Sequence, residues 1–248
     1  MKILLTNDDG YDHPGIKTLY SELCKNHEVF MMAPDVNKSG FGSALTFLTP
    51  LKEKKIDKNI YSLDGTPVDC VKTSLNGKSL FELDLANLES ENLDLGNNEL
   101  CPFTPDIVIS GINPGPNLGP VFLYSGTVSA AIEGRNLKYP AIAVSVASFE
   151  ISDYGLAAKT VTSLLENIDD LDLPENSILN LNVPDHNIFP NPEIKITKTF
   201  LDSHLIPNEE IMDDFSCLEA GHISLSPIKI NTFDEASIKK AGDWLEQF

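Results

Sequence analysis

The sequence has few cysteines, and this shortage excludes two kinds of protein. Its 248 residues include only Cys24, Cys70, Cys101 and Cys217, and no two of them form a C-x-x-C pair. Their wide scatter fits neither a structural zinc site nor a disulfide framework. We therefore expect reduced, mostly buried thiols in a cytoplasmic protein.

Basic residues are also scarce. The chain has 18 Lys and Arg against 37 Asp and Glu, for a net charge of −19. A surface of this sign repels polyanions, so we expect no nucleic-acid partner. A small phosphorylated ligand is still compatible with the composition, provided that a cation bridges it to the protein.

Long apolar segments are missing. The N-terminal run Ile3–Leu5 is followed by Thr6-Asn7-Asp8-Asp9 and is too short for the core of a signal peptide. No later segment approaches the length of a membrane span, so we expect no membrane partner. The hydrophobic fraction of 42% and the charged fraction of 22% are ordinary for a globular protein of this size.

Short apolar runs alternate with segments of helical periodicity, which is typical of a parallel sheet covered by helices. The pattern predicts an α/β fold with a doubly wound, mostly parallel sheet. The predicted strands are Lys2–Thr6, Glu28–Ala33, Tyr61–Leu63, Asp106–Ser110, Ala141–Val146 and Ile178–Val183. The predicted helices are Ile16–Cys24, one that begins near Pro67, Thr127 to about Leu137, and Gly155–Ile168.

Two regions interrupt this alternation and suggest how the chain is organised. We predict a catalytic core over residues 1–185, with an exposed acidic insertion at about 76–102. Residues 186–248 form a predicted C-terminal extension that serves oligomerisation. It contains two strands as a small β-hairpin, Ile194–Thr199 and His222–Ile230, and a helix from Thr232 or Asp234 through Trp244.

Three polar loops follow predicted strand ends, namely Asn7–Gly15, Asp35–Ser43 and Gly111–Gly119. In a doubly wound sheet, ligands bind beyond the carboxyl ends of the strands. All three loops would open at that edge. We expect the functional site where they meet.

The first loop contains the adjacent carboxylates Asp8 and Asp9. Two neighbouring charges are costly to bury unless a hard cation such as Mg²⁺, Mn²⁺ or Ca²⁺ neutralises them. A solvated Asp-Gly turn explains the same residues about equally well once the position after the first strand is considered. His13 lies in the same loop and could contact a substrate or support the site.

The other two loops carry neutral donors and acceptors. Residues 37–43 supply amides, hydroxyls and glycine N–H groups, although a surface turn accounts for them too. Asn113 can offer a carbonyl oxygen to a metal. Ser125, Gly126 and Thr127 stand at a predicted helix start, which can bind phosphate while one hydroxyl caps the helix.

Other readings of the acidic pair require patterns that are missing. A flavodoxin-like signalling module that accepts a phosphoryl group could use Asp8 and Asp9, but it needs a phosphorylatable Asp at a later strand end, where this chain has Ser110 and Gly111. A dehalogenase-type phosphatase needs Asp-x-Asp. A dinucleotide-binding enzyme needs G-x-G-x-x-G in the first loop.

Several motifs, in order, resemble those of the survival protein SurE family of 5′/3′-nucleotidases. The resemblance covers about residues 1–75 and 103–185. The motifs that carry it are Ile3–Gly10 with Pro14–Ile16, Ala33–Asp35 through Ser39-Gly40, Gly65–Val71, Ser110–Asn117, Tyr124–Thr127, Glu133–Arg135 and Leu181–Pro184.

The resemblance implies a Rossmann-like, three-layer fold and hydrolysis of nucleoside 5′- and 3′-monophosphates, with polyphosphate as a further substrate of some members. It implies one divalent cation per subunit, held by Asp8, Asp9, Ser39 and Asn113, and a homodimer. Asp8 or Asp9 would accept the proton of the attacking water. The predicted phosphate or substrate contacts are Asn7, Gly40, Ser43, Asn117, Ser125, Gly126 and Thr127.

The chain departs from the family pattern in two places. Residues 76–102 are longer than the pattern expects between its neighbouring motifs. The segment between Thr199 and Gly221 is shorter and acidic, where family members carry a long hairpin that exchanges between subunits.

Overall fold

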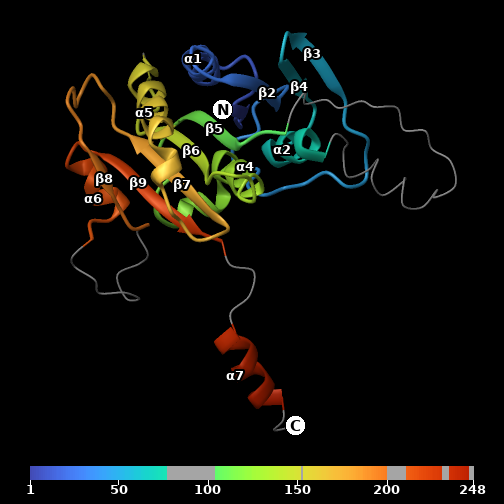
Figure 1. Ribbon diagram of the computed structural model, residues 1–248, viewed down its shortest axis with the longest axis vertical. Coiled ribbons are helices and arrows are strands. Elements are labelled where there is room, and N and C mark those ends of the chain that lie inside the picture. Colours follow the sequence, from blue (N-terminus) through green and yellow to red (C-terminus); the bar gives the residue numbers. More distant parts are fainter. Residues whose placement is uncertain (77–103, 152, 200–210, 231–234, 246–248) are drawn as a thin grey trace, which may run out of the picture.

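The computed structural model describes residues 1–76, 104–151, 153–199, 211–230 and 235–245 (Figure 1). In these ranges the strands form one mixed sheet in the order β3-β4-β2-β1-β5-β6-β7-β9-β8. The strands are β1 (Lys2–Thr6), β2 (Glu28–Pro34), β3 (Glu53–Asp57), β4 (Ile60–Leu63), β5 (Ile107–Pro114), β6 (Ala141–Val146), β7 (Ser177–Val183), β8 (Ile194–Ile196) and β9 (Ile223–Lys229).

Helices cover both faces of the sheet. Figure 1 shows α1 and α5 on one side and α2 and α4 on the other. The helices are α1 (Pro14–Leu23), α2 (Pro67–Asn76), η1 (Gly119–Tyr124), α4 (Gly126–Glu133), α5 (Gly155–Glu166), η2 (Ile168–Asp170), α6 (Asp214–Glu219) and α7 (Glu235–Leu245). The predicted three-layer α/β fold is therefore confirmed.

The alternation of side chains along β1 explains why the core has two halves. Ile3 and Leu5 belong to the cluster under α1 and α5, whereas Leu4 belongs to the cluster under α2 and α4. Successive strand residues point to opposite faces, so a strand buried on both faces must be apolar throughout. β6 and β7 are likewise buried along their whole length.

The order of the strands places a topological switch point at β1. From β1 the chain builds outward through β2 and β4, and later it returns to pair β5 with the other edge of β1. β6 and β7 then extend the sheet in that second direction. Ligands of doubly wound sheets bind at such a switch point, at the carboxyl ends of the strands.

The structure differs from the prediction in several elements. The edge strand β3, whose residues are all exposed, and the short helices η1 and α6 were not predicted. α4 ends at Glu133 rather than near Leu137, because Gly134 forms its C-cap. Among the described cysteines, Cys70 and Cys217 are buried and Cys24 is exposed, which agrees with the expectation of mostly buried thiols.

The C-terminal strands join the main sheet. β9 pairs antiparallel with β7, and β8 pairs parallel with β9. The expected hairpin is thus absent, because a connection that includes α6 lets the two strands run in the same direction. The division at residue 185 stays a prediction. Cys101 and nearly all of the predicted insertion lie outside the described residues.

The packing of Gly134 on β5 yields a stability prediction. A Cβ at position 134 would lie 2.4 Å from Cγ2 of Val108, which is fully buried. We expect Gly134→Ala to lower the free energy of unfolding by about 1–3 kcal/mol, as other overpacked sites do. Urea denaturation measures this change.

Gly242 in α7 is a matched control, because nothing lies within 4 Å of a Cβ placed there. Gly242→Ala should leave stability unchanged or raise it slightly. Equal effects of the two substitutions would contradict the proposed clash with Val108.

Candidate functional site

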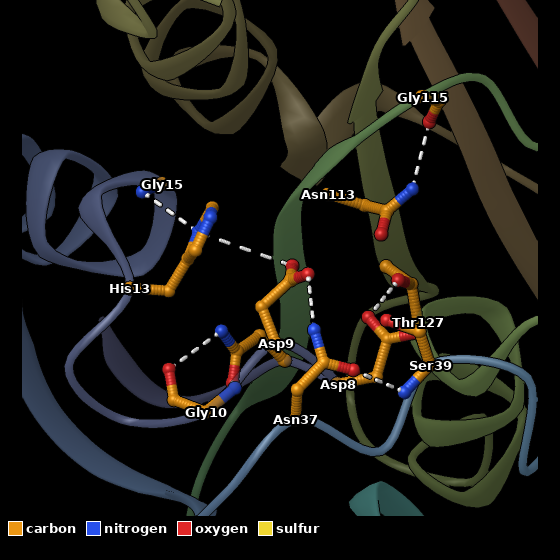
Figure 2. Close-up of polar contacts among 11 residues, drawn as sticks. Asp8, Asp9, Gly10, His13, Gly15, Asn37, Ser39, Asn113, Gly115 and Thr127 are labelled. Atoms are coloured by element: carbon orange, nitrogen blue, oxygen red, sulfur yellow. Dashed lines mark hydrogen bonds and ion pairs between the residues drawn. The ribbon is translucent and has the colours of Figure 1, made fainter. Parts of the chain in front are cut away.

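Side chains from the three loops come together beyond the carboxyl ends of β1 and β5. Figure 2 shows Asp8 and Asp9 after β1, with Ser39 facing them from the second loop. Asn113 faces them from the end of β5, which continues to Pro114 and so includes the start of the predicted third loop. Thr127 reaches the same place from the start of α4. The loops therefore meet as expected, at the switch point of the sheet.

The carboxylate of Asp8 is buried against the start of α4. Its Oδ1 accepts a hydrogen bond of 2.5 Å from Oγ1 of Thr127. A Cβ at Gly126 would lie 2.8 Å from Cβ of Asp8, so only glycine allows the helix this close. Burial raises the pKa of Asp8, and hydrogen bonds from Thr127 and from the backbone partly oppose that rise.

Asp9 lies next to it with little hydrogen bonding. Its side chain is 3% exposed, and its Oδ2 has no hydrogen-bond partner among the described residues. Nδ2 of Asn37 is 3.5 Å from Oδ1, at the outer limit of a hydrogen bond. Burial, and then the charge of Asp8, raise the pKa of Asp9 to about 7. A cation between the two carboxylates would offset both effects by stabilising their charged forms.

His13 serves the first loop as a helix cap. Its Nδ1 accepts a hydrogen bond of 3.2 Å from the backbone N–H of Gly15, at the start of α1. Burial lowers the pKa of His13, so the ring is neutral with Nδ1 unprotonated. Nδ1 lies 3.9 Å from Oδ2 of Asp9, but two acceptors at that distance form no ion pair.

Asn7 shapes the loop from inside. Its side-chain amide donates to the carbonyl of Gly10 at 2.9 Å, and its Oδ1 accepts from the N–H of Gly10 at 3.2 Å. Gly10 has a φ of 106°, which L side chains rarely adopt. Both ends of the Asn7 amide thus hold the loop in shape, and its predicted contact with a substrate stays a prediction.

The second loop is attached to the site at both sides of Ser39. The backbone N–H of Lys38 donates to the carbonyl of Asp8 at 2.7 Å. Oγ of Ser43 donates to Oγ of Ser129 in α4 at 3.0 Å. Ser39 and Gly40 lie between these anchors and are exposed, with the N–H of Ser39 bonded to Oδ1 of Asn37.

Two asparagines of the third loop have different surroundings. Nδ2 of Asn113 donates to the carbonyl of Gly115 at 2.7 Å, which turns Oδ1 toward the acidic pair in Figure 2. Asn117 is buried and donates through Nδ2 to Oγ of Ser145 at 2.9 Å. The amide of Asn117 therefore ties the loop to β6, and its predicted contact with a substrate stays a prediction.

A buried carboxylate that was not predicted supports the next segment. Oδ2 of Asp214 accepts from the N–H of Gly119, the first residue of η1, at 2.9 Å. Asp214 is fully buried at the start of α6. It lies in an acidic part of the sequence, where no pattern distinguishes a buried carboxylate from a solvated one.

The N-terminus of α4 is suited to binding an anion. Oγ of Ser125 accepts from the N–H of Val128 at 3.1 Å, which is a regular N-cap. The positive end of the helix then faces Asp8 and the space beside it. Ser125, Gly126 and Thr127 are all buried, so a ligand there would be partly withdrawn from water.

The donors around the acidic pair suit a hard divalent cation. They are two carboxylates, the Ser39 hydroxyl and the Asn113 carbonyl oxygen, which match Mg²⁺, Mn²⁺ or Ca²⁺. The described part of the chain contains no cluster of three or more His, Cys, Asp or Glu side chains suited to a metal. The unsatisfied Oδ2 of Asp9 is the observation that favours an added cation.

Comparisons with known proteins agree with this geometry. The family model described as "Survival protein SurE" matches residues 3–86 and 90–204. A "5′-nucleotidase SurE" of Legionella pneumophila (strain Lens) is 37% identical over 93% of this chain and 92% of its own. A protein of the same name from Geotalea daltonii is 44% identical over 75% of this chain and 66% of its own.

A solved structure shows the same likeness in three dimensions. The SurE protein from Aquifex aeolicus aligns with a TM-score of 0.74 and 31% identity, over 99% of this chain and 100% of that one. Sequence, fold and the arrangement of the three loops therefore lead to one assignment. The chain belongs to the survival protein SurE family.

Proposed function

We propose that this protein is a 5′-nucleotidase, which hydrolyses nucleoside monophosphates to a nucleoside and phosphate with the help of a divalent cation. The buried pair Asp8-Asp9 at the switch point is the observation that carries the proposal. The relatives named 5′-nucleotidase match nearly the whole chain and support a phosphomonoesterase of nucleotides.

The signalling alternative is not supported. A phosphoryl-accepting module needs an aspartate at the end of a neighbouring strand, but β5 continues from Ser110 through Gly111 to Pro114. The relatives that match the chain are nucleotidases by name. These names support our proposal that the acidic pair serves hydrolysis.

One divalent cation per subunit would be held by Asp8, Asp9, Ser39 and Asn113. When bound, it neutralises charge on the phosphoryl oxygens and makes a water more acidic. Magnesium, manganese and calcium all fit this set of oxygen donors.

The protein's own residues position the reactants. The positive end of α4, at Ser125–Thr127, binds the phosphoryl oxygens and stabilises charge that develops on them. Thr127 keeps Asp8 in one orientation through its 2.5 Å hydrogen bond. Either carboxylate could accept the proton of the attacking water, and Asp9 is the better candidate because Asp8 already accepts the bond from Thr127.

Substrate range and assembly extend the proposal. Nucleoside 3′-monophosphates and short polyphosphates share the phosphoryl group that the site would bind.

A homodimer is supported by α7, which lies away from the sheet in Figure 1. Ile238, Trp244 and Leu245 on this helix are each at least 58% exposed, which suggests a partner surface. Within the described residues, no helix has the length and apolarity to cross a bilayer.

The acidic pair can be tested with Asp9→Asn. We expect kcat/KM for nucleoside monophosphates to fall by at least about a thousandfold, because a ligand charge and the proton acceptor are both lost. Mn²⁺ binding, followed by calorimetry, should weaken as well. The circular dichroism spectrum should stay unchanged, since an amide replaces the carboxyl.

Asp12→Asn is the matched control, because Asp12 is an exposed carboxylate of the same loop that pairs with Lys17. It should keep nearly full activity. Wild-type hydrolysis by the Asp9 variant, or hydrolysis by the wild type in excess EDTA, would contradict the proposed site.

A pH dependence follows from the raised pKa of Asp9 in the metal-free protein. The folded-state pKa of about 7 exceeds the ordinary value of 3.8. Stability from such a group is fully present below pH 4 and is lost as the pH rises through 7. In EDTA, Asp9→Asn should therefore raise the free energy of unfolding by about 2 kcal/mol at pH 8, and by much less at pH 4.5.

Urea denaturation of both proteins at the two pH values measures this difference. A pH-independent effect of the substitution would show that the charge of Asp9 does not oppose folding.

The dimer can be tested by placing charges on the apolar face of α7. Sedimentation equilibrium should show a dimer for the wild type and a monomer for the double variant Ile238→Lys/Trp244→Lys, because lysines resist burial in an interface. Lys239→Gln, off that face, should remain dimeric. A monomeric wild type would overturn the assembly proposal.

A further inference from the structure

Asp69 has a buried carboxylate that the proposed chemistry does not use. It is 2% exposed, in the first turn of α2. Thr46 donates to it twice, from the backbone N–H to Oδ1 at 2.9 Å and from Oγ1 to Oδ2 at 2.7 Å. The backbone N–H of Thr66 adds a third bond, of 2.9 Å, to Oδ2.

Part of this arrangement is an ordinary capping box. The N–H of Asp69 donates to Oγ1 of Thr66, and the N–H of Thr66 donates back to the Asp69 carboxylate. A capping box ends there. In this protein the same carboxylate also takes both donors of Thr46, a residue 23 positions earlier in the chain.

Thr66 strengthens the same connection. Its Oγ1 lies 2.7 Å from the carbonyl of Ala44 and 3.1 Å from Oδ2 of Asp69. A hydroxyl has one proton, and the shorter distance assigns it to Ala44. Asp69 and Thr66 together therefore hold Ala44 and Thr46, which directly follow Ser43.

The segment held in this way carries the predicted ligands of the second loop. Residues 38–50 form no helix or strand, so individual contacts determine where Ser39, Gly40 and Ser43 lie. On the other side of these residues, the N–H of Lys38 is bonded to the carbonyl of Asp8. The segment is thus fixed to the acidic pair at one end and to α2 at the other.

We propose that Asp69 is a positioning residue, which holds the Ser39–Ser43 segment against the acidic pair and so sets the affinity for cation and phosphate. The inference rests on the proposed function, because that function gives Ser39 and its neighbours their roles. Hydrogen bonds to a carboxylate are roughly twice as strong as neutral ones, which makes Asp69 an effective anchor for an otherwise irregular segment.

Two substitutions test the hydrogen bonds between Asp69 and Thr46, one at each residue. Asp69→Asn replaces an acceptor oxygen with a donor, and Thr46→Val removes one hydroxyl while leaving the capping box intact. We expect the Mn²⁺ dissociation constant and KM for a nucleoside monophosphate to rise roughly tenfold in Asp69→Asn and roughly threefold in Thr46→Val. At saturating Mn²⁺ and substrate, kcat should stay within about threefold of wild type, because the acidic pair is unchanged.

Asp213→Asn is the matched control. Asp213 accepts from the N–H and the hydroxyl of Ser216 at the start of α6, which is the same chemistry away from the acidic pair. This variant should lose stability without a change in Mn²⁺ affinity. Hydrogen exchange of the amides of residues 38–46 should become faster in the Asp69 and Thr46 variants only.

The measurements distinguish the positioning role of Asp69 from the proposed nucleotidase activity. Folded Asp69 and Thr46 variants with wild-type Mn²⁺ affinity and amide exchange would overturn the proposal. If Asp69→Asn does not fold, Thr46→Val decides the question alone. A wild-type protein that hydrolyses no nucleotide would refute the proposed function, whereas Mn²⁺ binding and exchange would still decide whether Asp69 holds the segment.

Discussion

Repulsion between two adjacent buried carboxylates is the constraint around which this structure is arranged. Asp8 and Asp9 follow β1 directly, and both side chains are almost fully withdrawn from water. Such a pair is unfavourable unless positive charge is supplied. The helix dipole of α4 and the Thr127 hydroxyl supply part of it, and the oxygen donors of Ser39 and Asn113 complete a set that suits a divalent cation.

The fold keeps these groups together by ordinary packing. β1 is central, so the loop after it is flanked by the ends of β2 and β5. Gly126 allows α4 to approach Asp8 more closely than any side chain would permit. Asn7 and His13 form hydrogen bonds inside the first loop, which fix its shape. The proposed cation site thus depends on residues outside its proposed ligand set.

Much of this could be predicted from the sequence, for identifiable reasons. Strands such as β1 and β6 are short runs of apolar residues, and the loops after them contain polar residues whose convergence follows from parallel topology. β3 escaped prediction because its residues are all exposed and show no buried face. The bond from Asn117 to Ser145 could not be predicted, because an amide in a loop has no sequence signature for its partner. The roles of Asp69 and Asp214 could not be predicted either, because a buried carboxylate is recognisable only by the donors that the fold brings to it.

The bond from Asp214 to the N–H of Gly119 has a consequence for how the chain can be divided. α6 lies beyond residue 185, yet it holds the first residue of η1, the helix that leads into Ser125. A fragment that ended at the predicted domain boundary would retain every proposed cation ligand while losing this support. The smallest part of this chain that keeps the support of η1 is therefore longer than the proposed ligand set alone would suggest.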